Sequence, residues 1–408
     1  MAVLLTAALA PAASGGGPGA GPATRSQTSK LLGAKNPAKG AAVKVGIISN
    51  GKSANIDNTD ELTSSEAIVK WINEYRGGIG GRPIDLVTCT DQNDPAKAAD
   101  CANQMIQEKV AAVVIGQNGV LESVWTPLHN AGIPTFIFGA GNPNVLADTS
   151  TTFVMAGPRA TLFSLPSGVA KKTKSKQLSA IIIDVPAATG FFKDPGPQMF
   201  KDVGVKMDLV AIAPGTADMT PQMQRVVSTN PKGAVFIVGN DAFCIAALNG
   251  LRAAGFDGKV ATIQQCLTEA TRTAVPSDFL KGIQISSGSP LDDRKHPATK
   301  QFNAVLDKYL TEDVDRTAGY PIGMFIVLSG LDVATEGLKG DVTSQSIIAA
   351  AKAMGWSELP GTGFHFRCNG KADPANPAVC AAATNAATLD ASGEAISYTP
   401  VNDTPIPD

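Results

Sequence analysis

The chain has 408 residues, of which 44% are hydrophobic and 17% charged, and its formal net charge is -2. This length supplies material for two or three domains with well-filled cores. The near-neutral net charge provides no positive electrostatic field that would attract nucleic acid or an acidic membrane surface. No internal apolar run approaches the roughly 18 residues that span a bilayer. The sequence therefore predicts a soluble protein outside the strongly basic and membrane-spanning classes.

The N-terminal residues indicate export. The run MAVLLTAALAPAAS combines an apolar stretch with small residues, as the end of a secretory signal peptide does, although it lacks a basic start. Ser14 precedes GGG, where a lipoprotein signal places its lipidated cysteine. Residues 15–42 are rich in Gly, Pro, Ala and Ser and predict a flexible tether, with the folded part beginning near Val43. We expect an exported protein, periplasmic or at the cell surface, and leave a membrane tether open.

The six cysteines favour disulfides, since none forms the C-x-x-C spacing of a zinc ribbon or a thioredoxin motif. Many connectivities are open, so local pairing is a preference, and six buried thiols in a cytosolic protein are the alternative. Disulfides would place the protein outside the cytosol. In chain order the local pairs are Cys89–Cys101, Cys244–Cys266 and Cys368–Cys380.

From Val43 onward, short apolar runs typical of strands alternate with helical patterns. The first strand is VKVGIIS (43–49), and the next helix is expected from Thr63, where TSSE makes a capping box with Glu66. A second helix has Asp94 as its N-cap. The further strands are expected at 83–88, 111–116, 134–139, 178–184, 207–212, 233–239, 259–263 and 282–286.

Such strands separated by helices imply parallel sheets covered on both faces. Nine or ten strands make a large sheet for one domain, so two α/β lobes fit the length better. The last stretch, 361–408, is rich in Ala, Thr, Asn and Pro. We expect it to be mostly irregular and held by the pair Cys368–Cys380.

The stretch KVGIISNGKS matches G-x-x-x-x-G-K-S, with Gly46, Gly51, Lys52 and Ser53 at the positions of a nucleotide-binding P-loop. A P-loop needs a strand that ends before its first glycine and a helix that begins at the Lys-Ser pair. Here Gly46 lies inside the apolar run, and the residues after Ser53 are poor helix formers. We interpret the match as coincidence; a nucleotidase using Lys52 and Ser53 is the enzyme alternative.

Other catalytic patterns are weaker. The sequence has no G-x-S-x-G elbow and no H-E-x-x-H, and its histidines, His129, His296 and His365, are scattered. We interpret His129 and His296 as solvated surface residues. The sequence therefore predicts no catalysis, no cofactor and no metal.

Three blocks in the same order resemble the type 1 periplasmic solute-binding proteins of the Leu/Ile/Val-binding kind. The most specific is INEYRGGIGGRPIDLVTCTDQNDPAKAADCANQMI (72–106), in which the glycines end a helix and start a strand. The second is AAVVIGQNGVLESVWTPLHNAGIPTFIFGAGNPNVL (111–146), and the third is GLRAAGFDGKV (250–260). The resemblance covers the chain from about Val43 to the 360s.

The resemblance implies an α/β fold with two doubly wound parallel-sheet lobes, a three-segment hinge and a ligand cleft between the lobes. It places residues 43–158 and 290–366 in lobe 1, and 159–289 and 367–408 in lobe 2. Residues 1–42 are the signal-like segment and tether. The hinge crossings are expected near Gly157–Thr161, Ser287–Leu291 and Phe366–Gly370.

The resemblance also implies ligand-binding positions. Lobe 1 would use the loop after its first strand (Asn50, Ile56), the turn GQNGV (Asn118, Gly119, Val120), the turn after PTFIFG (Ala140, Gly141) and Tyr320. Lobe 2 would use Thr189, Asp241 and Phe243.

In the family, two hydroxyl side chains bind an α-carboxylate. Here one is replaced by Gly119 or Val120, depending on the alignment, and the other by Gly141. Backbone N–H groups near Val120 could still hold an anion. Asp241 would suit a ligand amine, or else caps a helix. A branched-chain amino acid is thus one candidate beside less polar solutes.

The resemblance implies a non-catalytic component of an ABC uptake system, a monomer that works with a permease and an ATPase. A ligand-sensing receptor domain of the same fold is the alternative.

Overall fold

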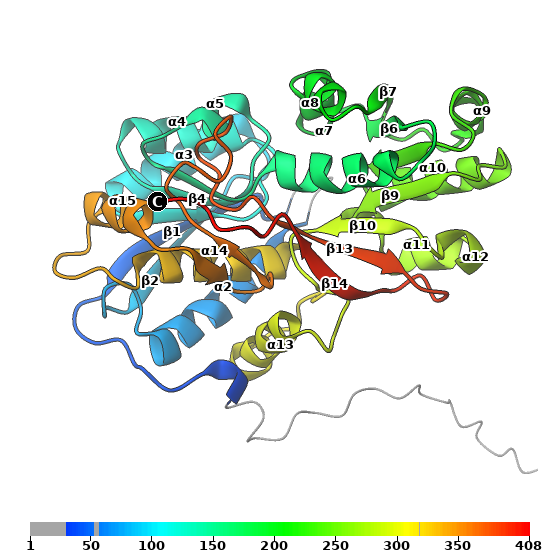
Figure 1. Ribbon diagram of the computed structural model, residues 1–408. Coiled ribbons are helices and arrows are strands. Elements are labelled where there is room, and N and C mark those ends of the chain that lie inside the picture. The colour runs from blue at the N-terminus through cyan, green and yellow to red at the C-terminus, as the bar shows by residue number, and fades with distance from the viewer. Residues whose placement is uncertain (1–29, 53–56, 318) are drawn as a thin grey trace, which may run out of the picture.

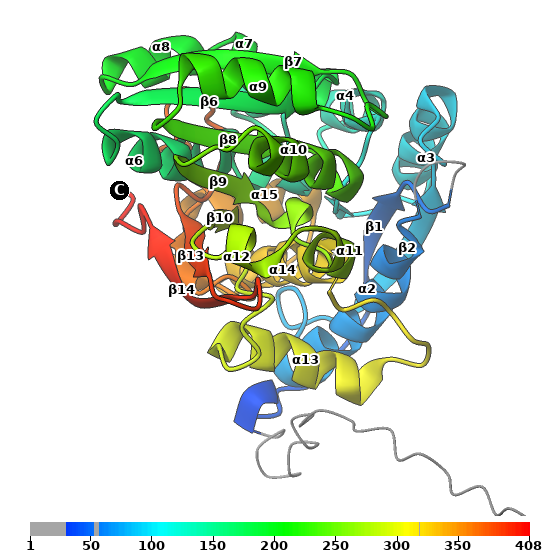
Figure 2. The same cartoon turned by 90° about the vertical axis from the view of Figure 1, so that its right-hand side faces the viewer.

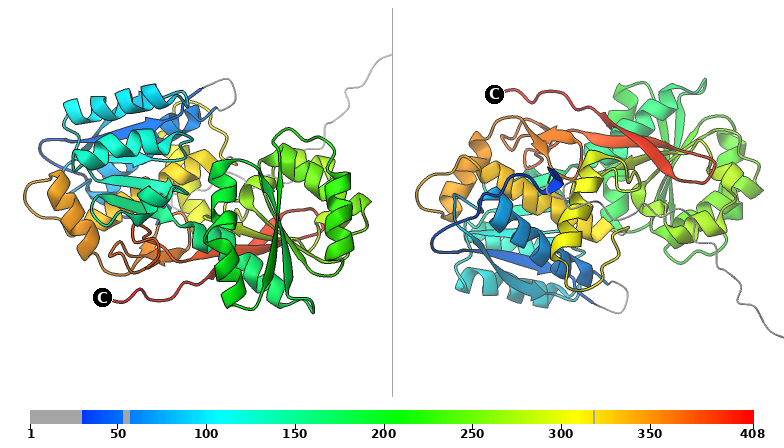
Figure 3. Two further views of the ribbon diagram at one scale, coloured as in Figure 1. Left: turned by 90° about the horizontal axis from the view of Figure 1, so that it is seen from above. Right: turned by 90° about the horizontal axis from the view of Figure 1, so that it is seen from below.

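The computed structural model describes residues 30–52, 57–317 and 319–408, and the statements below concern these residues. They form two lobes that lie side by side (Figure 1; Figure 3). Lobe 1 is built on a five-stranded sheet of order β2-β1-β3-β4-β5, and lobe 2 on a seven-stranded sheet of order β14-β13-β10-β9-β8-β6-β7. Figure 2 shows the second sheet from β7 to β14. The expected two-lobed α/β architecture is confirmed.

The five strands of lobe 1 run parallel, with β1 at Val43–Ser49, β2 at Ile84–Thr90, β3 at Ala112–Ile115, β4 at Thr135–Gly139 and β5 at Thr152–Ala156. Gly46 lies in the middle of β1, where a Cβ would stand 2.6 Å from Met105 Sδ of helix α3. This glycine therefore allows α3 to pack closely on the sheet and does not belong to a phosphate loop.

Helices from both ends of the chain cover this sheet. The N-terminal ones are α2 (Thr59–Trp71, continued to Arg76 by a π-helical turn), α3 (Pro95–Gln107), α4 (Leu121–Asn130) and α5 (Pro143–Ala147). The later elements are α13 (Pro297–Tyr309), α14 (Gly319–Thr335), α15 (Ser344–Ala353) and the two-stranded β11 (Ser357–Leu359) and β12 (Phe364–Phe366). The stacked rings of Trp71 and Phe325, 5.5 Å apart, lie in the core that joins α2 to α14.

Lobe 2 has five parallel strands and an antiparallel hairpin. The strands are β6 (Gln177–Ile183), β7 (Lys206–Ile212), β8 (Ala234–Val238), β9 (Lys259–Ile263), β10 (Gln284–Ser287), β13 (Thr384–Leu389) and β14 (Ala395–Val401). The helices are α6 (Leu165–Lys171, preceded by a π-helical turn Ala160–Ser164), α7 (Pro186–Lys193), α8 (Gly196–Asp202), α9 (Thr220–Thr229), α10 (Asp241–Ala253), α11 (Glu269–Ala274), α12 (Ser277–Leu280) and a 3-10 turn Gln264–Cys266.

Three segments cross between the lobes: residues 157–159 after β5, 288–296 after β10, and 367–383 between β12 and β13. The third lies against lobe 1 before it reaches lobe 2, because Val379 pairs with Val154 of β5. Gly157 faces the same valine, and a Cβ on it would stand 2.8 Å from Val379 Cγ1. The first and third crossings are therefore packed together.

The three expected disulfides are confirmed, with Cα–Cα distances of 5.6 Å for Cys89–Cys101, 5.3 Å for Cys244–Cys266 and 4.3 Å for Cys368–Cys380. The second helix also begins as predicted, because the side chain of Asp94 accepts hydrogen bonds from the N–H groups of Ala96 and Lys97.

Two expectations from the sequence are wrong. Helix α2 begins at Thr59, and not at Thr63, because Asp60 and Glu61 suit the positive end of the helix dipole. Residues 361–408 are not mostly irregular, since they contain β12, β13 and β14, and β13 and β14 make the second sheet mixed instead of all-parallel. Strand β13 consists of Thr, Asn, Ala and a single Leu, which give a weak apolar signal.

Part of the expected tether also packs on lobe 1. Leu32 is 3% exposed and lies in the lobe 1 core, where its carbonyl accepts a hydrogen bond from Trp71 Nε1. Further along, Ala38 N–H donates to the carbonyl of Asn73, and Lys35 pairs with Glu74 at 2.5 Å. In the described part of the chain, no helix is long and apolar enough to cross a membrane.

Candidate ligand-binding site

The first and second crossings leave from the carboxyl ends of β5 and β10. Because parallel strands end at the same edge of a sheet, the loops after β1, β2, β3 and β4 in lobe 1 lie toward lobe 2. The loops after β6, β8 and β9 likewise lie toward lobe 1. We call these the carboxyl-end loops. In open α/β sheets, ligands bind at this edge.

Asp91 joins three carboxyl-end loops of lobe 1. Its carboxylate is fully buried and accepts hydrogen bonds from Asn50 Nδ2 at 2.7 Å and from Asn118 Nδ2 at 2.6 Å. The two amide oxygens are also engaged, because Gly119 N–H donates to Asn50 and Val120 N–H donates to Asn118. The structure therefore brings these predicted ligand-binding residues together, and their polar groups hold the loops to one another in this conformation.

A buried carboxyl group lies beside this network. Glu61 of α2 is 1% exposed and accepts hydrogen bonds from Ser49 Oγ at 2.5 Å and from Gln117 N–H at 2.9 Å. Burial raises the pKa of Glu61 to about 7, and the two hydrogen bonds offset only part of that rise. A Cβ on Gly116 would stand 2.3 Å from Glu61 Oε1, so the close approach requires glycine. Glu61 thus fixes the loops after β1 and β3 to α2.

Aromatic side chains stand at the same edge of lobe 1. Tyr320 is the second residue of α14 and is half-buried. Burial, and then the nearby carboxylates of Glu61 and Asp57, raise the pKa of Tyr320, so its hydroxyl stays a neutral hydrogen-bond donor. Phe138 is the last residue but one of β4 and is partly exposed, and a Cβ on Gly288 of the second crossing would stand 3.3 Å from its ring. Lobe 1 therefore offers both an apolar surface and a hydroxyl donor.

Ala140 and Gly141 follow β4 and carry no polar side chain. Ala140 is half-buried against the core of lobe 1, and Gly141 is exposed. Asn142, which comes next, caps α5 by accepting hydrogen bonds from two backbone N–H groups. Polar contacts of Ala140 and Gly141 with a ligand would therefore come from their backbone groups.

In lobe 2, the alternative that Asp241 caps a helix is wrong. The N-cap of α10 is Asn240, whose side chain accepts a hydrogen bond from Phe243 N–H at 3.0 Å. Asp241 is the first residue of the helix, partly exposed, and its carboxylate accepts a hydrogen bond from the N–H of Ala242 at 2.7 Å. Asp241 therefore lies at the positive end of the α10 dipole.

The two other predicted residues of lobe 2 are buried. Phe243 is 4% exposed and packs in the core between the second sheet and α10. Thr189 is 1% exposed and donates its hydroxyl to the carbonyl of Val185 in its own helix. The Phe243 ring lies against Gly239, in the loop before Asp241, where a Cβ would stand 2.4 Å from Phe243 Cδ1. Because both side chains are buried, neither is exposed for contact with a ligand in this conformation.

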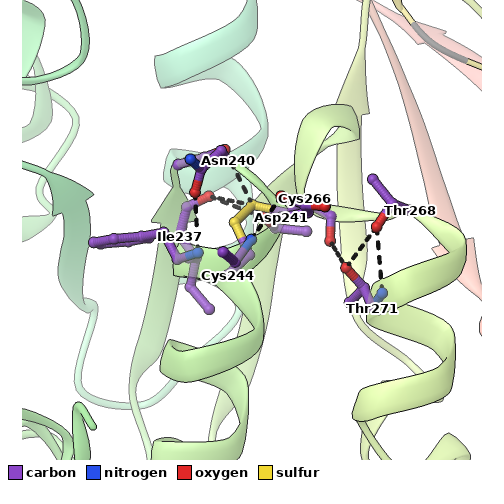
Figure 4. Close-up of a disulfide and its surroundings, with 11 residues drawn as sticks. Ile237, Asn240, Asp241, Cys244, Cys266, Thr268 and Thr271 are labelled. Atoms are coloured by element: carbon purple, nitrogen blue, oxygen red, sulfur yellow. Dashed lines mark hydrogen bonds between the residues drawn. A yellow bond between two sulfur atoms is a disulfide. The ribbon is translucent and has the colours of Figure 1, made fainter. Parts of the chain in front are cut away.

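The disulfide Cys244–Cys266 connects two neighbouring carboxyl-end loops of lobe 2 (Figure 4). Cys244 lies in the first turn of α10, after β8, and Cys266 lies in the turn after β9. Thr271 Oγ1 donates to the carbonyl of Cys266 at 2.8 Å and holds the second loop to α11. The covalent bond therefore fixes the place of Asp241 relative to the end of β9.

The P-loop geometry is not formed in the described residues. Gly46 is paired within β1, and Lys52 forms an ion pair with Asp57 at 2.8 Å. Among the residues that the structure describes, the first helix after β1 begins at Thr59. Ser53 and Ile56 lie outside the described residues, and with them the end of the motif and the predicted ligand-binding position at Ile56.

The histidines are held by neighbours and are not simply solvated. His129 stacks on Trp125 and hydrogen-bonds Thr151 at 3.1 Å, and His296 caps α13. Among the described residues, no group of three or more His, Cys, Asp or Glu side chains is arranged to hold a metal ion.

The sequence patterns did not predict a role for four residues that organise the lobe 1 loops, namely Ser49, Glu61, Asp91 and Gln117. Ser49, Asp91 and Gln117 share one signal, because each ends or closely follows an apolar strand. Glu61 carried no such signal, since the later helix start left it in a loop.

The sequence matches the periplasmic binding protein family over residues 42–385. Because this match spans most of the chain, the protein belongs to the periplasmic binding protein family. No curated protein matches the sequence.

Solved structures share the fold at low sequence identity. An extracellular ligand-binding receptor from Verminephrobacter eiseniae superposes with a TM-score of 0.69 at 15% identity, covering 88% of this chain and 100% of its own. The branched-chain amino acid transporter substrate binding protein LivJ from Streptococcus pneumoniae, in complex with isoleucine, gives 0.63 at 17% identity, covering 88% and 99%. An ABC transporter solute binding protein from R. palustris, in complex with 4-hydroxybenzoate, gives 0.69 at 18% identity, covering 90% and 98%.

Proposed function

We propose that this protein is the extracellular solute-binding component of an ABC uptake system and that it captures a small organic solute between its lobes without catalysis. Membership of the periplasmic binding protein family supports an extracellular or periplasmic place of action. The observation that carries the proposal is the set of carboxyl-end loops of lobe 1, which Asp91 and Glu61 hold in one arrangement next to the crossings. Binding sites need such fixed loops because disordered ones lose entropy on binding.

The charges at the carboxyl-end loops favour a ligand that carries an amine. Lys52 and Lys193 are each paired, with Asp57 and Asp184 respectively. Asp241 lies at the N-terminus of α10. Among the described residues, the ion pairs that the structure shows do not include its carboxylate. A cationic group on the ligand would pair with it at the cost of partial desolvation.

The rest of the site favours a less polar body. Phe138 and Tyr320 supply partly exposed aromatic surface, and the loop at Ala140 and Gly141 supplies backbone groups. We therefore propose a small amino acid or a less polar organic solute. The bound molecules in the solved relatives, isoleucine and 4-hydroxybenzoate, define the two classes to compare.

A thermal-shift screen of amino acids, amides and aromatic acids tests this proposal. A solute that binds the folded protein raises the melting temperature in proportion to RT ln(1 + [L]/Kd). The Asp241→Asn variant should weaken an amine-bearing ligand by about tenfold or more and leave an aromatic acid unaffected. A shift with ATP and Mg²⁺ that Lys52→Ala abolishes would instead support the nucleotidase alternative.

Permease and ATPase subunits are the proposed partners, and we propose that the chain acts as a monomer. The N-terminal residues support export by a signal peptide, and the Gly- and Pro-rich stretch after it supports the proposal of a tether to the membrane. A receptor domain that senses the same solute is the second candidate function, and the family fold supports it equally. Loss of solute uptake on gene deletion, restored by the intact gene, would separate transport from sensing.

A further inference from the structure

The chain returns to lobe 1 after β14. Strand β14 belongs to lobe 2, where Tyr398 lies in the core. Residues 402–408 then run toward lobe 1 (Figure 3). We call residues 402–408 the strap, since side chains on both lobes hold it.

On the lobe 2 side, the strap is attached by its first residue. Asn402 Nδ2 donates a hydrogen bond to Ser164 Oγ at 2.6 Å. Ser164 ends the π-helical turn that follows the first crossing and continues into α6. The strap is therefore attached to the part of lobe 2 that directly follows the first crossing.

On the lobe 1 side, His365 holds the next residue of the strap. Asp403 accepts two hydrogen bonds from this histidine, one from its backbone N–H and one at its ring Nδ1, both at 2.9 Å. The ring of His365 also stacks on Trp356 with centroids 4.0 Å apart. His365 lies in β12 between Phe364 and Phe366, which are both in the lobe 1 core.

Arg367 and Asn369 hold the rest of the strap at the start of the third crossing. Arg367 Nη1 donates to the carbonyl of Ile406 at 3.2 Å, and Asn369 Nδ2 donates to the carbonyl of Pro407 at 2.7 Å. The same guanidinium lies 2.5 Å from Asp408 and is anchored to lobe 1 by its Nε, which donates to Met354. Ile406 is 7% exposed, so the strap also buries an apolar side chain.

We propose that the strap is a fourth, non-covalent tie between the lobes and that it limits how far they open. The lobe 2 contact is made by Asn402 and the first lobe 1 contact by Asp403, which are adjacent residues. One residue of chain spans about 3.8 Å between Cα atoms and does not stretch. A hinge rotation that moves Ser164 away from His365 by more than a few ångströms must therefore break one of the two attachments.

Release of the strap should therefore widen the range of lobe angles in the ligand-free protein. The covalent crossings alone would then resist rotation, and hinge motion is carried by only a few residues. This inference concerns the protein without ligand and holds whichever solute the site takes.

Pulsed EPR distances between the lobes test the strap directly. Spin labels are placed on exposed helix positions, at Lys352→Cys in α15 and Gln224→Cys in α9, in a chain whose six native cysteines are in disulfides. In the Asp403→Ala/Ile406→Ala variant, the distance distribution should be broader and its mean longer than in the wild type. Thr404→Ala, an exposed change inside the strap, is the matched control and should match the wild type. Equal distributions in all three proteins would overturn the proposal.

Hydrogen exchange provides a second readout that needs no double variant. The His365 N–H donates to the strap, whereas the Arg367 N–H donates to Cys380 within the third crossing. In Asp403→Ala, the His365 amide should exchange on the order of tenfold faster and the Arg367 amide at an unchanged rate. A His365 amide in the wild type that exchanges as fast as an exposed loop would show that the strap is not attached, and would also overturn the proposal.

Discussion

Ser49 donates its hydroxyl hydrogen to the carboxylate of Glu61 at 2.5 Å, with both side chains shielded from water. This bond joins the end of the first strand to the first turn of α2 at the edge that faces lobe 2. A buried carboxyl group without an ion pair is costly when ionised. Glu61 therefore links the arrangement of the candidate site to pH.

We predict that Glu61 makes the stability of the protein fall between about pH 4.5 and pH 7. Its pKa is about 7 in the folded protein and 4.5 in the unfolded chain, so over this window only the unfolded chain gives up the proton. Protonated Glu61 stabilises the protein fully below pH 4.5. As the pH rises from there through 7, the free energy of unfolding therefore falls by about 3 kcal/mol. Denaturant unfolding of Glu61→Gln at pH 5 and pH 8 checks this, because the variant should gain about that much relative to wild type at pH 8.

Glu66→Gln is the matched control, since Glu66 lies on the exposed face of the same helix. It should follow the wild-type pH profile. If Glu61→Gln also follows that profile, the carboxyl group of Glu61 is ionised at little cost and the prediction is wrong.

We predict that Asp91→Asn destabilises the protein and weakens solute binding. An asparagine would present an N–H group to the amide of Asn50 or Asn118, where the carboxylate now accepts two hydrogen bonds. Loss of such charge-assisted bonds costs about 2–4 kcal/mol. Unfolding in urea and titration with a solute from the screen measure the two effects. Asp94→Asn is the control, because it also removes one negative charge but keeps a side chain that can cap the helix. It should change stability and solute affinity by far less than Asp91→Asn.

We predict that the Cys244–Cys266 disulfide contributes to affinity as well as to stability. The bond closes a loop with a sequence separation of 22, for which chain entropy gives about 3 kcal/mol. Cys244→Ala/Cys266→Ala should lower stability by that order. At a temperature where the variant remains folded, it should also bind an amine-bearing solute more weakly, since Asp241 is no longer fixed to the loop after β9.

The Cys89→Ala/Cys101→Ala variant separates the two lobes in this experiment, because that disulfide lies in lobe 1 and does not touch Asp241. If both double variants lose affinity for the amine-bearing solute equally, the loss reflects general loosening and not the placement of Asp241.

We predict a large cost for breaking the buried ion pair of lobe 1. Arg76 Nε lies 2.8 Å from Asp332 Oδ2, and Asp332 is 4% exposed. Arg76→Met would leave that carboxylate buried and unpaired, at a cost of about 3–5 kcal/mol at neutral pH. Because burial already raises the pKa of Asp332 to about 6, the cost should shrink at pH 5, where the carboxyl group is protonated. An equal cost at both pH values would contradict this explanation.

The sequence predicted the parallel strands and the disulfides well. VKVGIIS is an apolar run broken only by the exposed Lys44 and ended by Ser49, and it forms β1 with those boundaries. The local cysteine pairs are correct because each closes a short loop. Strands and short disulfide loops depend on residues that are close together in the chain, so the sequence pattern alone indicates them.

The sequence could not show which polar groups satisfy one another. Asn50 was a candidate for binding ligand because it follows the first strand, but its amide is held by Asp91 and Gly119, which lie far along the chain. Phe243 looked available beside Asp241, yet a helix turns it into the core of lobe 2. Pairings of this kind depend on the register of the strands and on helix orientation, which apolar patterns leave open.

The central claim is that a solute closes the two lobes around itself. The most direct test measures the distance between the labels on α15 and α9 with and without the solute that gives the largest thermal shift. We predict that saturating solute shortens and narrows the distance distribution, and that Asp241→Asn raises the concentration needed if the solute carries an amine. A solute that stabilises the protein but leaves the distances between the lobes unchanged would contradict the claim.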